Sequence, residues 1–262
     1  GDDPGSPGRV ISGPKHFAGY GAALGGRDYD EVNLSDSELW NVYLPPFKAA
    51  VDAGAGNIMT AYMDLNGVPA TGNHWLLTEV LRGTWGFGGF LVSDAQAVHN
   101  LRTHGFAADL TDAGARALMA GVDMEMAIGD PAYAHLPEAI EAGRADEAAL
   151  DACVRRVLAA KVRMGLFDQP YVDEDQAREV LADPAHRAAA RQAAQRSAVL
   201  LRNEGGLLPL SSPASIAVIG PLADSRRDTL GPWVFDFDLD ETVTVLDGIR
   251  ARVGDSDRSG HD

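Results

Sequence analysis

Four short apolar segments alternate with helical patterns along the first half of the chain. The clearest is GFLVSD (residues 89–94), in which three apolar residues follow glycines and precede Ser93 and Asp94. A run this short is typical of a strand buried on both faces of a sheet. The other segments of this kind are VISGPKHF (10–17), NIMTAYM (57–63) and AGVDMEM (120–126). Alternation at these connection lengths predicts an α/β fold with parallel strands, either half of a (β/α)8 barrel or an open doubly wound sheet.

The rest of the chain predicts a long helix, a connection and a second domain. Residues 145–167 carry apolar side chains at helical spacing, and Asp183 and Pro184 match the N-cap and first residue of another helix. SIAVIGP (215–221) predicts a buried strand that opens a second α/β domain. We therefore expect a partial barrel over residues 1–167, a linker and connecting helix over 168–203, and the beginning of the second domain over 204–262.

Charge and cysteine content limit the kinds of partner and of structural cross-link that are expected for this chain. The formal net charge is −16, which argues against nucleic acid and anionic membranes as partners and suits a neutral substrate. Cys153 is the single cysteine, so neither an intrachain disulfide nor a cysteine metal site is expected. No apolar run approaches the roughly 20 residues that cross a bilayer. The chain begins at Gly1 without a signal-like segment, and we expect further residues to precede it.

Polar side chains stand at or near the ends of the expected strands. These residues are Lys15, His16, Tyr62, Asp94 and Glu125. In a barrel the carboxyl ends of the strands share one rim, so these side chains are expected to lie close together. Each also has a structural interpretation: a rim cation, a half-buried imidazole, a core tyrosine, a helix cap and a paired carboxylate, in the same order.

Three chemistries suit this group of residues. A carboxylate nucleophile with lysine and histidine binding hydroxyls suits retaining glycoside cleavage, which needs a second carboxyl about 5 Å away. Lys15 could instead form a Schiff base in an aldolase-type lyase, provided that its amine is desolvated. Hydrolysis by a metal held by His and Asp is the least favoured, because no ligand spacing such as HExxH occurs among the histidines.

A family resemblance ranks these alternatives. The chain contains, in order, KHFAGYGAALGGRDY, YLPPFKAAVDAG, MTAYMDLNGVPAT, LLTEVLRGTWGFGGFLVSD, HGFAAD, AGVDMEM, LLRNEGGLLPL and IAVIGPLADSRRD. Together they resemble glycoside hydrolase family 3, and within it the bacterial periplasmic-type β-glucosidases. The resemblance implies a (β/α)8 TIM barrel followed by an α/β sandwich domain. This chain would then hold the C-terminal half of the barrel, over residues 1–167, and the truncated beginning of the sandwich, over 204–262.

The resemblance also implies roles for individual residues. Asp94 would be the catalytic nucleophile. Lys15 and His16 would bind sugar hydroxyls, Tyr62 would lie beside the nucleophile, and Trp233 would flank the next sugar. No metal and no cofactor are implied.

The implied activity is that of a retaining, exo-acting β-glucosidase. It would hydrolyse terminal β-D-glucosyl residues through a covalent glycosyl-aspartate intermediate, with a small β-glucoside or cello-oligosaccharide as substrate and a periplasmic or secreted location. The family's acid/base glutamate is expected beyond Asp262 and the first four barrel strands before Val10, so the isolated chain is expected to be an inactive fragment. The alternative is a non-catalytic or misfolded remnant with residual sugar binding, or the lyase that uses Lys15.

Two positions depart from the family pattern. Ala95 follows the predicted nucleophile where Trp or His is common, so stacking on the leaving-group side is expected to be weaker or to come from elsewhere. Met63 stands where Asn is common.

Overall fold

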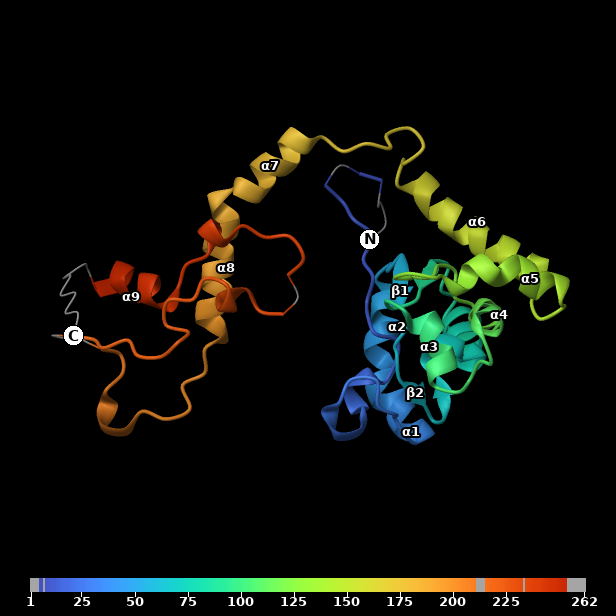
Figure 1. Ribbon diagram of the computed structural model, residues 1–262, viewed down its shortest axis with the longest axis horizontal. Helices are drawn as coiled ribbons and strands as arrows, with labels where there is room; N and C mark the ends of the chain where they lie inside the picture. The colour runs from blue at the N-terminus through green and yellow to red at the C-terminus, as the bar shows by residue number, and fades with distance from the viewer. Residues whose placement is uncertain (1–4, 7, 211–214, 233, 254–262) are drawn as a thin grey trace. The chain divides into compact units, whose positions relative to one another are not determined.

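A computed structural model describes residues 5–6, 8–210, 215–232 and 234–253 of the chain. The chain divides into two compact units, Gly1–Leu181 and Ala182–Asp262 (Figure 1). The expected boundaries at 167 and 203 remain a prediction about the domains of the folded protein. No helix within the described ranges has the length and apolarity needed to cross a membrane.

The first unit is a mixture of short strands and helices. Its strands are β1 (Asn57–Met59), β2 (Asp64–Leu65), β3 (Val68–Pro69) and β4 (Phe90–Val92). Its α-helices are α1 (Asp36–Glu38), α2 (Pro45–Asp52), α3 (Ala97–Thr103), α4 (Leu110–Ala120), α5 (Leu136–Glu141) and α6 (Glu147–Arg163). Two π-helical segments, η3 (Leu39–Tyr43) and η5 (Trp75–Thr84), precede α2 and β4, and 3-10 turns cover Tyr20–Ala22, Leu24–Gly26, Ala70–Gly72 and Ala132–His135.

A parallel pair of strands forms the centre of this unit. β1 pairs with β4 in the register Asn57↔Phe90, Ile58↔Leu91 and Met59↔Val92. The connection between them contains η5, as a parallel crossover requires. Ile58 and Leu91 are fully buried, and they belong to one apolar core with Phe17, Leu77 and Leu81. The strand predicted from GFLVSD is therefore confirmed.

The segment 10–17 lies along β1 without forming a strand of its own. The N–H groups of Asn57 and Met59 donate to the carbonyls of Ser12 and Pro14 at 3.2 and 3.3 Å, and the Phe17 N–H donates to Met59 at 2.9 Å. A single parallel bridge joins Phe17 to Thr60. The prediction of a regular strand over 10–17 is therefore wrong. Pro14 has no N–H with which to continue the ladder.

The segment 120–126 is likewise attached beside β4 by one bridge, Val92↔Met124. The N–H of Ser93 donates to the Met124 carbonyl at 2.9 Å, and the Met126 N–H donates to the Ser93 hydroxyl at 2.9 Å. A side chain thus replaces part of the ladder, and the predicted regular strand is wrong. The order of the neighbouring segments is nevertheless 10–17, β1, β4 and 120–126, all running parallel.

A buried carboxylate ties this sheet to its helices. Asp123 has a fully buried side chain, and its Oδ2 accepts from Arg82 of η5 at 2.5 Å and from the Leu91 N–H at 2.7 Å. Its Oδ1 accepts from Nε of Arg156 in α6 at 2.7 Å. Two guanidinium groups and one backbone amide therefore satisfy the charge that burial would otherwise make costly.

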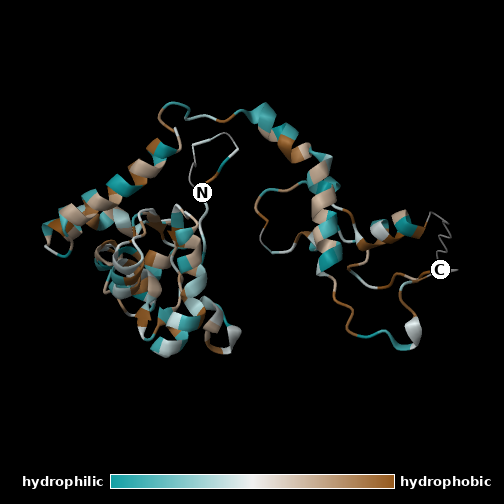
Figure 2. Cartoon of the chain, turned by 180° about the vertical axis from the view of Figure 1, so that it is seen from behind, coloured by the Kyte–Doolittle hydropathy of each residue, from teal (hydrophilic) through white to brown (hydrophobic). Residues whose placement is uncertain are grey.

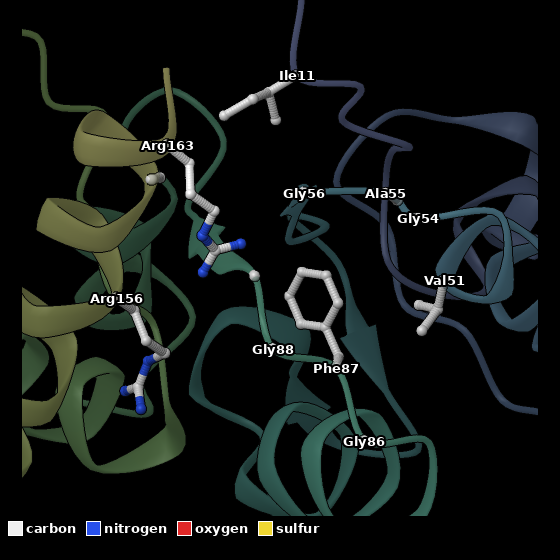
Figure 3. A pocket seen from close by; sticks show the side chains of 12 residues that line it. Ile11, Val51, Gly54, Ala55, Gly56, Gly86, Phe87, Gly88, Arg156 and Arg163 are labelled. Atoms are coloured by element: carbon white, nitrogen blue, oxygen red, sulfur yellow. The ribbon is translucent and has the colours of Figure 1, made fainter. Parts of the chain in front are cut away.

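A hollow of about 330 Å³ lies at the amino-terminal ends of β1 and β4. Figure 3 shows the Arg163 side chain extending into it beside Gly56 and Gly88. At Gly89 a Cβ atom would come within 2.3 Å of the Gly56 carbonyl oxygen, so the two backbones approach as closely as glycine allows. This end of the strands is opposite to the one that carries Asp94.

In the second unit and the residues leading to it, every regular element that is described is helical. They contain α7 (Glu174–Ala182), α8 (Pro184–Ser197) and α9 (Val245–Val253), with 3-10 turns at Glu204–Gly206, Asp228–Leu230 and Leu239–Glu241. The Asp183 side chain accepts from the Ala185 N–H at 2.8 Å, which confirms the predicted cap of α8. Hydrophilic and hydrophobic residues alternate along this helix (Figure 2).

The buried strand predicted at 215–221 is wrong. These residues form no strand, and the side chain of Ile219 is 91% exposed. A strand needs a neighbouring backbone to satisfy its N–H and C=O groups, and within the described part of this unit no ladder is formed.

Candidate active site

The site is built from three neighbouring segments at the carboxyl ends of the parallel strands. Asp94 follows β4 by two residues, Tyr62 follows β1 by three, and His16 lies in the segment beside β1. Nε2 of His16 lies 2.9 Å from Oδ2 of Asp94, and the Tyr62 hydroxyl donates to Oδ1 of Asp94 at 2.9 Å. Three predicted residues thus meet around one carboxylate.

Asp94 is held from several sides. The Ala95 N–H donates to its Oδ1 at 2.7 Å, in addition to the bonds from Tyr62 and His16. Its side chain is 13% exposed, so the carboxylate is largely enclosed yet reachable from solvent. The alternative interpretation as a helix cap does not apply, because the N-cap of α3 is Gln96.

His16 serves Asp94 as a neutral donor. Burial lowers the pKa of His16 more than the neighbouring Asp94 charge raises it, and the Lys15 ammonium lowers it further. A carboxylate has no proton to give, so Nε2 carries the hydrogen and Nδ1 is the unprotonated nitrogen. The contact at 2.9 Å is therefore a hydrogen bond from an uncharged imidazole at neutral pH.

Tyr62 is a phenol at any physiological pH. Burial raises its pKa, and the hydrogen bond to Asp94 and the charge of Asp94 raise it further. Its single proton is shared between Oδ1 of Asp94 and the Ala95 carbonyl, which lie 2.9 and 2.8 Å from the hydroxyl oxygen. The side chain thereby fixes both the carboxylate and the backbone that follows it.

Lys15 lies next to this group, but its side chain is exposed. Among the described residues it makes no hydrogen bond or ion pair, and its charge acts on the His16 imidazole. The desolvation that a Schiff-base lysine requires is not provided here. The exposed ammonium, next to His16 in the chain, is instead free to donate to a ligand.

The remaining candidates lie elsewhere. Glu125 has a structural role, because its carboxylate accepts from the N–H groups of Ala132 and Tyr133 at 3.1 and 2.8 Å. Trp233 lies outside the described residues. No cluster of His, Cys, Asp and Glu side chains suited to a metal ion occurs in the described ranges.

The glycine-rich loop after His16 adds two tyrosine rings to the site, and the sequence motifs did not predict their contacts. The Tyr20 ring contacts His16 edge-on at 5.1 Å, and the Tyr29 ring contacts Tyr62 edge-on at 4.8 Å. The Tyr20 hydroxyl donates to Asp28, which anchors the loop. Tyr29 has a φ of 69°, a left-handed conformation that is rare for a tyrosine. The GGRDY sequence signals a turn, but not which ring packs on which.

Two family models match most of the chain. The model described as Glycosyl hydrolase family 3 N terminal domain matches residues 5–160, which include the whole Asp94 site. The model described as Glycosyl hydrolase family 3 C-terminal domain matches residues 198–261.

Proteins of known activity are similar over most of this chain. A periplasmic beta-glucosidase of Salmonella typhimurium is 47% identical over 252 residues, which cover 94% of this chain and 33% of that protein. A beta-xylosidase of Formosa agariphila is 38% identical over 260 residues, covering 94% of this chain and 36% of that protein. The chain thus spans about one third of the length of these relatives.

A solved structure is also similar to this one. The crystal structure of a beta-glucosidase from Listeria innocua superposes with a TM-score of 0.85 at 40% identity, covering 93% of this chain and 34% of that one. Complexes of that enzyme with glucose and with isofagomine, and of a mutant of it with laminaribiose, give TM-scores of 0.84. The predicted barrel-type α/β fold is confirmed by this likeness together with the family match.

Proposed function

Because this chain belongs to glycosyl hydrolase family 3, we propose that it is the part of a retaining β-glucosidase that carries the nucleophile, Asp94. The single observation that supports this most is the set of donors around Asp94: His16, Tyr62 and the Ala95 N–H. These donors hold the two carboxylate oxygens in place. The exposed Lys15 directly precedes His16 in the chain.

The proposed reaction has two steps. In the first, a carboxylate oxygen of Asp94 bonds to the anomeric carbon while the glycosidic C–O bond breaks and the leaving oxygen takes a proton from an acid. In the second, water attacks the same carbon, loses a proton to the conjugate base, and releases Asp94 from the ester. Lys15 and His16 are proposed to hold sugar hydroxyls, with bonds that strengthen as positive charge develops on the ring.

The acid/base residue is proposed to come from outside the described site. Glu125, the glutamate predicted at the end of the segment beside β4, is engaged with backbone N–H groups. The relatives are about three times as long as this chain, which supports its being a segment of a longer enzyme. We expect little or no hydrolysis by the isolated 262 residues and full activity for the complete gene product that carries them.

A mechanism-based inhibitor tests the nucleophile directly. A 2-deoxy-2-fluoro-β-glucoside with a good leaving group should leave a fluoroglucosyl ester on the complete gene product, and peptide mass spectrometry should place it on Asp94. Asp94→Asn should abolish both labelling and turnover of an aryl β-glucoside. Asp28→Asn, which removes another carboxylate of the site, should retain the label. Labelling of a different residue, or turnover that survives in Asp94→Asn, would show that the assignment is wrong.

Glucoside preference is proposed from the higher identity to the glucosidase than to the xylosidase. A xylose ring lacks the hydroxymethyl group of glucose, and a difference of even one methylene in an apolar pocket changes kcat/KM by about 10- to 200-fold. Aryl β-glucoside and aryl β-xyloside should therefore be compared on the same preparation. The Salmonella relative is a periplasmic beta-glucosidase, which supports a periplasmic or secreted location for this protein.

A further inference from the structure

A second hollow lies on the first unit and has its own set of lining residues. Its volume is about 520 Å³, within the range of small-molecule sites. It is lined by residues from α1, η3, the β2–β3 hairpin and the start of η5: Asp36, Leu39, Trp40, Leu65, Asn66, Val68, Asn73 and Trp75. None of them belongs to the group around Asp94.

Two indole rings border this hollow and remain accessible. Trp40 is 40% exposed and Trp75 is 37% exposed, and their rings meet edge-on at 6.3 Å. Trp40 is further supported edge-on by Trp85 at 6.5 Å. The edge-on contacts fix the rings while leaving part of their flat faces open. Large aromatic groups held rigidly at the surface are characteristic of binding sites.

The polar groups of the hollow are few and partly unused. Asn73 is 8% exposed, and its side-chain oxygen accepts from the Leu76 N–H at 3.1 Å. Its side-chain amide N–H groups have no partner in the described chain. The carboxylate of Asp36 is also without a hydrogen-bond partner there. Asn66, by contrast, is held by Leu34 through both its amide oxygen and its amide nitrogen.

We propose that this hollow binds a neutral oligosaccharide, a β-linked glucan chain, outside the catalytic pocket. Indole faces cover the apolar C–H face of a pyranose ring, while the Asn73 amide donates to a hydroxyl and the Asp36 carboxylate accepts from one. The hollow contains no cation for an anionic ligand, and a single carboxylate is a poor metal site. The inference that the oligosaccharide is a glucan rests on the proposed function. The inference that the hollow binds a sugar does not.

Calorimetric titration of the complete gene product with cellotetraose tests this site, with saturating isofagomine present to block the Asp94 pocket. Native protein should bind cellotetraose, and Trp40→Ala should weaken binding about tenfold or more, which corresponds to about 1.4 kcal/mol. Asp36→Ala, an exposed substitution that leaves all three indoles in place, should weaken it as well. Tyr171→Ala is the matched control, because Tyr171 is 91% exposed and lies outside the hollow.

The remaining outcomes overturn one proposal or the other. Unchanged affinity in both Trp40→Ala and Asp36→Ala, or no binding by native protein, would exclude the oligosaccharide site. A parallel loss of aryl β-glucoside hydrolysis in Asp36→Ala would also exclude it, since the hollow would then support the catalytic pocket. Failure of isofagomine to inhibit hydrolysis would count against the proposed function, whereas the difference in affinity between native protein and Trp40→Ala would still report on the hollow.

Discussion

At the scale of single residues, Asp94 is distinguished by the number of donors that face it. Tyr62, His16 and the Ala95 N–H all point to its two oxygens. Under the proposed function, each donor lowers the nucleophilicity of the carboxylate slightly, and in return fixes its position for attack. Preorganisation of this kind lowers the free-energy barrier of a reaction by more than the same hydrogen bond contributes to the stability of the fold.

Tyr62→Phe removes one of these donors without changing the shape of the ring. A hydrogen bond to a charged group contributes about 1.5–3 kcal/mol, so turnover of an aryl β-glucoside should fall about 10- to 100-fold. The fall should appear in kcat rather than in KM, because the sugar is not the acceptor. Tyr43→Phe is the control, since its hydroxyl makes no hydrogen bond in the described structure. Equal kinetics for Tyr62→Phe and the native enzyme would contradict the orienting role.

His16 makes stability depend on pH in a defined window. Burial holds its pKa below the ordinary value of 6.5, so between these two values the unfolded chain binds more protons than the folded one. Stability should therefore fall as the pH drops below about 6.5, and level off below the folded pKa. Melting temperatures measured from pH 7.5 to 5 should show this slope in native protein and a smaller slope in His16→Asn. His186→Asn, at an exposed position in α8, should leave the slope unchanged.

At the scale of elements, the parallel pair β1–β4 is fixed to its helices by one ion cluster as much as by apolar packing. Asp123 joins η5, β4 and α6 through Arg82, the Leu91 N–H and Arg156. Burial raises the pKa of the adjacent Cys153 thiol to about 12, so this cysteine stays uncharged beside the cluster.

Asp123→Ala should destabilise the first unit by about 3–5 kcal/mol, because two partly buried guanidinium groups lose their buried counterion. Urea unfolding followed by tryptophan fluorescence measures this change. Asp52→Ala breaks an exposed pair with Lys48 and should cost about 1 kcal/mol or less. Similar losses for the two variants would mean that the buried cluster contributes no more than a surface pair.

At the scale of the whole molecule, the two units differ in how much apolar surface they bury. Nearly all buried side chains of the described chain belong to the first unit, whereas Leu201, Ile219 and Phe235 of the second are more than 90% exposed. Exposed apolar surface of this kind favours association with further polypeptide. The second unit is thus the part whose packing depends most on its surroundings.

Hydrogen exchange followed by mass spectrometry should separate the two units. Amides of β1, β4 and α4 should exchange slowly, because their hydrogen bonds lie in the buried core. Amides of 215–221 in the isolated chain should exchange within seconds, and those of the same segment in the complete gene product should be slower. Equal, slow exchange of 215–221 in both samples would show that the isolated chain already folds this segment.

Local sequence determined the features that need no distant partner. The strand at Phe90–Val92 and the cap of α8 by Asp183 follow from apolar run length and side-chain chemistry within a few residues. Placing His16, Tyr62 and Asp94 at strand ends also required only local patterns, together with the general geometry of parallel sheets.

Tertiary structure decided which distant segments satisfy one another. It set 10–17 beside β1 without a full ladder, buried Asp123 between two arginines, and placed the Tyr29 ring against Tyr62. It also left 215–221 unpaired, although the same apolar pattern formed a strand at β4. The physical reason is that a strand or a buried charge is stable only with a partner from elsewhere in the chain, and a local pattern does not say which partner will be within reach.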